Sequence, residues 1–234
     1  TPQPWINVIS NEAFGFHVAA EGAAFTWGRN SRDYQLTPWT NDPVINRPGE
    51  AIFIRDMDSG AVLSPYAALS RRKSVQFETR HGLGYSVFKS VQDGLEIEVG
   101  QTVHRTAPVK YLRLTLNNTT SEARSLKIYG YAEWVLGNNR PKTAPFILSH
   151  QDETTGAVLS TNPYSIDYSG RTAFLAASDM PSGFTASRRE FLGQGGSIYA
   201  PKAVIDGGVL SGSVEADGDA CAAIVVDVTL EAGA

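Results

Sequence analysis

The sequence predicts an all-β domain, and three observations lead to this fold class. Many short segments alternate apolar and polar residues with a period of two, which is the period of a half-buried strand. Glycine, proline and asparagine separate these segments, as turns between strands require. Helical periodicity is nearly absent, and the best candidate is a short turn near residues 65–69. About fifteen strands fit one large antiparallel sandwich of two sheets over residues 1–234.

The N-terminal quarter predicts four strands and one long loop. The strands are expected at residues 5–9, 14–18, 24–27 and 51–54. The loop of about twenty residues between Trp27 and Ala51 is long for a compact domain. Loops of this length usually have a function or pack against another part of the protein.

The clearest strand pattern lies in the middle of the chain. Strands are expected at residues 74–79, 85–88, 95–103, 112–116 and 126–136. Leu112, Leu114 and Leu116 alternate with polar residues, and Asn117-Asn118 is expected to end that strand as a turn. These segments predict half-buried antiparallel strands.

The last third continues the pattern less regularly. Further strands are expected at residues 146–148, 157–159, 173–176 and 224–228. Gly193, Gly195 and Gly196 predict a flexible turn before Ile198. No helix pattern follows these glycines, so they do not predict a phosphate-binding loop.

Composition and charge argue against several classes of function. The formal net charge is -4 and the pI about 5.6, without a basic run, so we expect no nucleic-acid partner. No apolar run approaches the roughly 18 residues that span a bilayer, so we expect no direct membrane insertion. The single cysteine, Cys221, lies in an apolar run and is predicted to be buried and unreactive. Both ends look cut, and we expect the chain to be a piece of a longer protein.

The four histidines do not predict a metal site. His17, His81, His104 and His150 are too far apart in the sequence to form a helical pair of metal ligands. A metal site assembled from distant strands stays open as an alternative, but we expect no metal and no cofactor. The chain also has no Gly-x-Ser-x-Gly motif, so an esterase triad of that type has no support.

The polar stretch that begins at Asn30 is the candidate functional segment. Pro38 and Pro43 remove backbone donors and favour an extended chain. Between them Trp39 offers an apolar plate beside the amide of Asn41 and the carboxylate of Asp42. This combination suits a sugar, which has an apolar face and a rim of hydroxyls.

Trp39 is the one tryptophan that we expect to be exposed. It is flanked by Pro38 and polar residues. Trp5, Trp27 and Trp134 lie in apolar strand segments and are predicted to be packing residues.

The carboxylates of this stretch leave two interpretations open. Two carboxylates beside a sugar suggest a glycoside hydrolase, and Asp42, Glu50 and Asp56 are available. Alternatively, Glu50 and Asp56 each pair with an arginine and hold the loop in shape, the partners being Arg32 or Arg55. We favour this pairing, and Asp42 is then equally a turn former.

Several longer motifs occur over nearly the whole chain. They are Pro4-Trp5-Ile6-Asn7-Val8-Ile9, Phe25-Thr26-Trp27, Asn30-Ser31-Arg32, Leu36-Thr37-Pro38-Trp39, Gly49-Glu50-Ala51, Arg80-His81-Gly82, Gly130-Tyr131, Glu133-Trp134-Val135-Leu136-Gly137, Asn162-Pro163-Tyr164 and Gly170-Arg171. Together they resemble the phosphorylase-like region of bacterial cyclic β-1,2-glucan synthases. The wider relatives are the cellobiose and chitobiose phosphorylases, inverting glycoside phosphorylases once grouped with the glycosyltransferases.

The resemblance implies an architecture and a mechanism. Family members begin with a large β-supersandwich of the galactose-mutarotase-like type, followed by a helical linker and an (α/α)6 barrel. Residues 1–234 are then the N-terminal sandwich of a longer enzyme, without the barrel that carries the general acid. In the family reaction inorganic phosphate is the co-substrate, bound mainly by the barrel, and it attacks the anomeric carbon with inversion. No catalytic residue is expected in this chain.

The resemblance also implies a supporting role for the loop. In the family the sandwich packs against the barrel, and its loops help to wall the sugar cleft. The residues expected to contact a β-glucan oligosaccharide are Arg32, Gln35, Trp39, Asn41 and Asp42. Alternatively the loop only docks the barrel, with Trp39 as a buried anchor. The family further implies a possible homodimer, and a soluble region of a bacterial inner-membrane protein on the cytoplasmic side.

Two other functions stay open. A stand-alone sugar epimerase of the same fold needs a histidine and a carboxylate on the concave sheet, and His81 or His104 with a glutamate is available. A purely structural docking module has no sugar affinity and exposes an apolar patch where the barrel docks.

Overall fold

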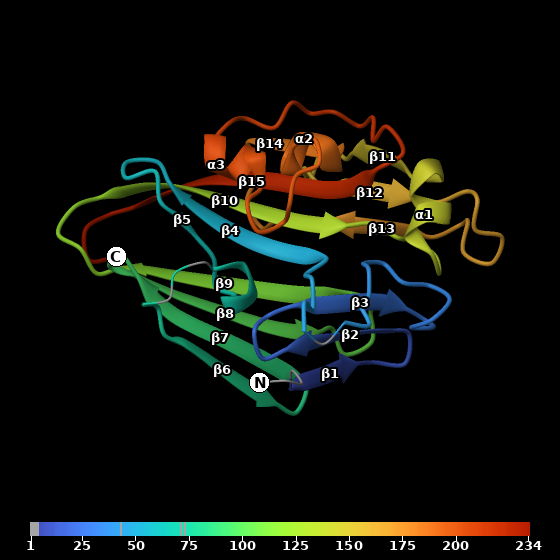
Figure 1. Ribbon diagram of the computed structural model, residues 1–234, viewed down its shortest axis with the longest axis horizontal. Coiled ribbons are helices and arrows are strands. Elements are labelled where there is room, and N and C mark those ends of the chain that lie inside the picture. Colours follow the sequence, from blue (N-terminus) through green and yellow to red (C-terminus); the bar gives the residue numbers. More distant parts are fainter. Residues whose placement is uncertain (1–4, 43, 71, 73) are drawn as a thin grey trace.

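The computed structural model of the protein describes residues 5–42, 44–70, 72 and 74–234 (Figure 1). Fifteen strands and a few short helices form in this part of the chain, which confirms the predicted all-β class. The strands make four antiparallel sheets, and the two larger ones pack on each other as the predicted sandwich. Pro4 of the first motif and Pro43 of the candidate functional segment lie outside the described residues.

The central sheet has five strands in the order β14-β15-β10-β4-β5. Tyr129 and Tyr131 point to one face, where the ring of Phe191 stacks on Tyr131 at 4.7 Å between centroids. Short helices α2 and α3 cover this face (Figure 1). The elements named here are β4 (Glu50–Asp56), β5 (Val62–Leu63), β10 (Arg124–Glu133), β14 (Gly183–Ser187), β15 (Ala220–Leu230), α2 (Arg188–Leu192) and α3 (Lys202–Asp206).

The four-stranded sheet is a meander of consecutive strands. It consists of β6 (Phe77–Gly82), β7 (Tyr85–Gln92), β8 (Leu95–Val103) and β9 (Lys110–Asn118). Asp93 and Gly94 join β7 to β8 with φ angles of 49° and 75°, which a two-residue hairpin turn needs because both central residues adopt positive φ. Leu95 and Ile97 pack on Ile54 and thereby attach the meander to the second face of the central sheet.

Two three-stranded sheets extend the sandwich. One contains β1 (Ile6–Ser10), β2 (Phe14–Ala19) and β3 (Ala24–Gly28), and it lies beside the end of the meander (Figure 1). The other contains β11 (Leu148–Gln151), β12 (Val158–Thr161) and β13 (Thr172–Leu175), and it covers one end of the central sheet through Val158, Ala173 and Ile224. The remaining short helices are η1 (Ala67–Leu69), α1 (Arg140–Thr143) and η2 (Ala144–Phe146).

Several boundaries differ from the prediction. Strand β10 ends at Glu133 instead of residue 136, and Leu136 beyond its end has a φ of 44°, which lies outside the strand region. Strand β9 continues through Asn118, which is fully buried and donates from Nδ2 to the carbonyls of Glu122 and Glu231. Trp5 is 76% exposed, so its prediction as a packing residue was wrong.

The helical elements match the prediction only in part. The short turn expected near residues 65–69 corresponds to η1, whereas α1, α2, α3, β5 and β14 were not predicted. Helix η2 was not predicted either, and the strand expected at residues 146–148 begins only at Leu148, as β11. These elements have five residues or fewer, too few for a periodic pattern to emerge. No helix among the described residues is long and apolar enough to cross a bilayer.

Candidate functional site

The candidate loop between Trp27 and Ala51 is held at its middle by backbone hydrogen bonds. The N–H of Gln35 donates to the carbonyl of Gly137 at 2.8 Å, and Gly137 returns a bond at 3.2 Å. The N–H of Leu36 donates to the carbonyl of Thr26 at 2.9 Å. The segment from Tyr34 to Leu36 therefore lies like an extra strand between β3 and the chain that follows β10, and it divides the loop into two turns.

The first turn is a short capped turn. Asn30 Oδ1 accepts from the backbone N–H groups of Arg32 and Asp33 at 2.9 and 3.0 Å. This side-chain acceptor replaces a backbone partner and stabilises the turn. The Arg32 side chain is 92% exposed, with a 4.0 Å contact to Asp33.

The second turn carries the tryptophan. Trp39 is 52% exposed, and its ring lies 6.4 Å from that of Phe25 on β3. Asn41 is exposed, whereas Asp42 is half-buried. Asp42 Oδ1 accepts from the N–H groups of Val44 and Ile45 at 2.9 and 3.0 Å, which is the turn-forming role considered for it above.

The five predicted sugar-binding residues therefore do not form one cluster. Trp39, Asn41 and Asp42 share the second turn, Arg32 lies on the first, and Gln35 lies in the fastened segment between them. No hydrogen bond or ion pair is found among these five side chains in the described part of the chain. Their role in binding a sugar stays a prediction.

Glu50 is the residue that anchors the second turn. Its Oε1 accepts from the hydroxyls of Thr37 and Thr26 at 2.7 and 2.5 Å, and its Oε2 accepts from Lys110 Nζ at 2.6 Å. Burial alone would raise the pKa of the Glu50 carboxyl, but Lys110 and the two hydroxyls outweigh it and hold the pKa below its ordinary value. The expected pairing of Glu50 with Arg32 or Arg55 was wrong, although its expected role as a structural ion pair agrees with this geometry.

Asp56 also pairs with a distant residue instead of Arg32 or Arg55. Its Oδ2 accepts from Nε and Nη2 of Arg124 at 2.8 and 2.5 Å. Strands β4 and β10 pair in the register that sets Leu126 opposite Asp56. Arg124 lies two residues before Leu126 on the same strand, so its side chain reaches Asp56 within the sandwich. Neither Glu50 nor Asp56 is free to serve as an acid or base, which argues against the hydrolase interpretation.

A buried cluster of charged residues holds the C-terminal end of the loop through Arg47. Glu133 is 2% exposed and accepts from Arg47 Nη2 at 2.7 Å and from Arg188 Nε at 3.0 Å, while Arg140 Nε lies 3.1 Å away. Asp219 contacts Arg140 and Arg188 from the other side, at 2.6 and 3.1 Å. Burial would raise the pKa of Glu133, but the three arginines hold it below its ordinary value. No local sequence pattern indicates this cluster, because its members are dispersed between residues 47 and 219.

The two histidines considered for an epimerase take part in local hydrogen bonds. His81 Nδ1 lies 2.9 Å from Ser86 Oγ across the β6–β7 hairpin. His104 Nδ1 accepts from the N–H groups of Thr106 and Ala107 at 3.2 and 2.8 Å. Neither has a carboxylate among its hydrogen-bond partners in the described residues, and these residues hold no cluster of three potential metal ligands.

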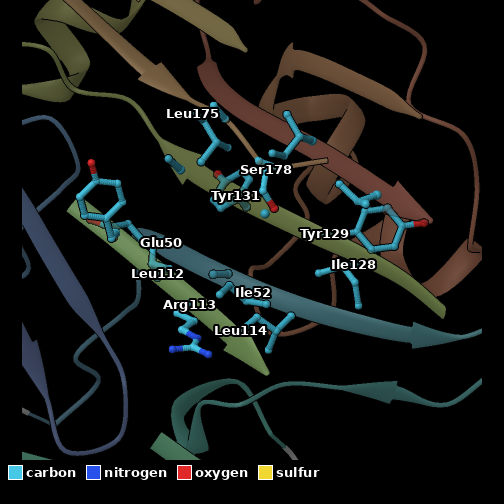
Figure 2. Close-up of a pocket in the computed structure, with 18 of the residues that line it drawn as sticks. Glu50, Ile52, Leu112, Arg113, Leu114, Ile128, Tyr129, Tyr131, Leu175 and Ser178 are labelled. Carbon is cyan, nitrogen blue, oxygen red and sulfur yellow. The ribbon is translucent and has the colours of Figure 1, made fainter. Parts of the chain in front are cut away.

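An apolar groove of about 620 Å³ runs along the second face of the central sheet, between β9 and the end of β13 (Figure 2). Its floor includes Ile52 and Ile128, and its sides include Leu112 and Leu114 of β9 and Leu175 of β13. Its volume is within the range of small-molecule sites, although its lining is mainly aliphatic.

Comparison with known proteins relates this architecture to carbohydrate enzymes. A cyclic β-(1,2)-glucan synthase, NdvB of Rhizobium meliloti (strain 1021), is 70% identical over 233 residues, which are 100% of this chain and 8% of the relative. The N,N'-diacetylchitobiose phosphorylase of Vibrio proteolyticus is 22% identical over 99% of this chain and 30% of its own length. The solabiose phosphorylase of Paenibacillus borealis is 25% identical over 100% of this chain and 31% of its own length. The chain thus spans less than a third of each of these relatives.

The family model that matches is the supersandwich domain of glycosyl hydrolase 94, and the match extends over residues 1–234. This agrees with the antiparallel sheets and with the family resemblance of the sequence motifs. The chain therefore belongs to the glycosyl hydrolase 94 supersandwich-domain family, which cyclic glucan synthases and glycoside phosphorylases share.

Proposed function

We propose that this domain is the supporting, non-catalytic part of an enzyme that processes β-glucans, and that its second turn forms a wall of the sugar cleft. The observation that carries the proposal is the position of Trp39. Trp39 is 52% exposed although Thr37, two residues earlier, is buried and hydrogen-bonded. An aromatic plate on a fixed support loses little conformational entropy when a sugar stacks on it. Asn41 in the same turn is exposed and would supply hydrogen bonds to sugar hydroxyls, and the exposed Arg32 on the first turn would do so only for a longer oligosaccharide.

The cleft would be completed by a catalytic domain of the longer chain. The matched region is only 30% of the length of the chitobiose phosphorylase, which leaves ample chain for such a domain in that relative. The proposed partner is the (α/α)6 barrel implied by the sequence resemblance, with inorganic phosphate as a co-substrate bound mainly there. A homodimer and a location on the cytoplasmic side of a bacterial inner membrane are proposals from the same resemblance.

A calorimetric titration with linear β-1,2-gluco-oligosaccharides tests the wall. We expect the unaltered chain to bind with a Kd on the order of 1 mM, equivalent to about -4 kcal/mol. Trp39→Ala should abolish the heat of binding. Trp5→Ala is the matched control, since Trp5 is also exposed but lies just before β1, and it should bind as the unaltered chain does. Binding that is equal in all three proteins would contradict the proposal.

The aliphatic groove favours a second function, which is docking of another domain. Leu112 is 40% exposed on the side of this groove. Apolar surface of this kind is typical of a face that another domain covers. If docking is the sole role, the titration gives no heat with any of the three proteins. In that case a Leu112→Ser change in the full-length enzyme should lower activity more than Trp39→Ala does.

A further inference from the structure

The carboxylate of Glu50 joins three sheets and the candidate loop. Glu50 is the first residue of β4 in the central sheet, and Lys110 is the first residue of β9 in the meander. Thr26 belongs to β3, and Thr37 lies in the loop. Three segments, β3, the loop and β9, therefore meet at the carboxylate that β4 carries.

The ion pair at this junction is shielded from water. The side chains of Lys110 and Glu50 are 7% and 16% exposed. The ammonium group of Lys110 also lies 4.2 Å from the centre of the Phe16 ring, a cation–π arrangement. Water competes weakly at such a site, so the geometry of the pair is more strongly fixed than that of a surface pair.

Thr37 connects this junction to the second turn. Its hydroxyl donates to Glu50 and accepts from the N–H of Thr26 at 2.9 Å. The next residue, Pro38, packs against Gly49, where an added Cβ would lie 2.6 Å from Pro38 Cδ. Trp39 follows directly, so the direction in which its ring leaves the sandwich depends on these two contacts.

We propose that Glu50, paired with Lys110, is a positioning residue that acts through Thr37 to hold Trp39 in one orientation. The functional importance of this orientation rests on the proposed sugar wall. The positioning of Trp39 is independent of that proposal, because the contacts that produce it involve no sugar. A bond to a charged carboxylate is stronger than a neutral one, which suits a contact that must fix a turn.

The first test compares two changes at Thr37. Thr37→Val removes the hydroxyl at nearly constant volume, and Thr37→Ser keeps it. The readout is the set of four indole N–H signals of the protein labelled with 15N-tryptophan, assigned with Trp39→Phe. We expect Thr37→Val to shift or broaden the Trp39 signal, with hydrogen exchange about tenfold or more faster in the amides of Leu36 and Thr37, which both donate to the carbonyl of Thr26, while Thr37→Ser leaves both unchanged.

The second test separates positioning from general loss of stability. The double change Lys110→Met/Glu50→Gln should move the Trp39 signal and leave the Trp134 signal in place. Arg124→Met/Asp56→Asn is the matched control, because it removes a buried ion pair between other strands, and it should leave the Trp39 signal in place. If Thr37→Val does not fold, this pair of double variants decides the question alone. An unmoved Trp39 signal in Lys110→Met/Glu50→Gln, or an equal movement in the control, would overturn the proposal.

The sugar titration keeps the two proposals apart. Absence of binding to the unaltered chain would count against the sugar wall, while the indole signals still decide the positioning. If the unaltered chain binds, Thr37→Val should bind at least about threefold more weakly, and Thr37→Ser should bind equally well. Unchanged binding by a Thr37→Val protein whose Trp39 signal has moved would show that the orientation is not used for sugar.

Discussion

Arg124 donates two hydrogen bonds to the carboxylate of Asp56 inside the sandwich. Its Nε and Nη2 lie 2.8 and 2.5 Å from the same carboxylate oxygen, Oδ2. The third nitrogen, Nη1, donates to the carbonyl of Asp93 in the turn between β7 and β8 at 2.9 Å. One guanidinium therefore joins the central sheet to the meander.

Loss of this contact should be costly. Arg124→Met leaves the Asp56 carboxylate without its partner in a site where only 3% of the side chain is exposed. We expect the free energy of unfolding to fall by about 3 kcal/mol, measured by urea denaturation. Lys127→Met on the same strand is the control, since its partner Asp227 is 54% exposed, and it should cost less than about 1 kcal/mol. Equal losses in the two variants would contradict the structure.

The Glu50 junction predicts a specific pH dependence. Its carboxyl has a pKa below the ordinary value of 4.5, so the folded state favours the charged form and gains stability above that value. This gain is lost as the pH falls through the folded pKa. The difference in unfolding free energy between the unaltered chain and Glu50→Gln should therefore be largest near neutral pH and shrink on acidification. A difference that stays constant from pH 7 to pH 3 would contradict it.

The single thiol should be inert in the folded protein. Cys221 is completely buried, and burial raises the pKa of its thiol well above the ordinary value. We expect no reaction with a thiol reagent such as dithionitrobenzoate in native buffer, and one equivalent after unfolding in urea. Rapid reaction of the native protein would show that the central sheet opens near β15.

Gly49 should not tolerate a side chain. A Cβ at this position would approach Pro38 Cδ to 2.6 Å, and both atoms belong to stiff parts of the chain. Gly49→Ala should lower stability by about 1–3 kcal/mol. Gly100→Ala in β8 is the control, because a Cβ there meets no atom within 4 Å, and thermal denaturation should show little change or a small gain. A similar loss in both variants would show that the close packing of Pro38 on Gly49 is not the cause.

Local patterns in the sequence predicted most strands, but they did not predict which distant residues would contact one another. The alternation from Leu95 to Val103 matches β8 in full. The partner of Glu50 was expected among nearby arginines, but it is Lys110, 60 residues away. A period of two indicates which face a residue occupies but not which strands are neighbours or in what register. Leu136 illustrates a second limit, because its hydrophobicity suggested a longer strand and nothing in the local pattern indicates its positive φ.

The order of strands in the central sheet has a consequence for how the protein is made. In the meander each strand pairs with the next one in the chain, so that sheet can form as soon as about forty of its residues are available. In the central sheet β10 pairs with β4 and with β15, and β15 ends at Leu230. The second edge of β10 therefore stays unpaired until the chain has been synthesised as far as β15. We expect β4 and β10 to leave the ribosome as an apolar half-sheet with an exposed edge, which stays prone to aggregation until β15 is available to pair with it.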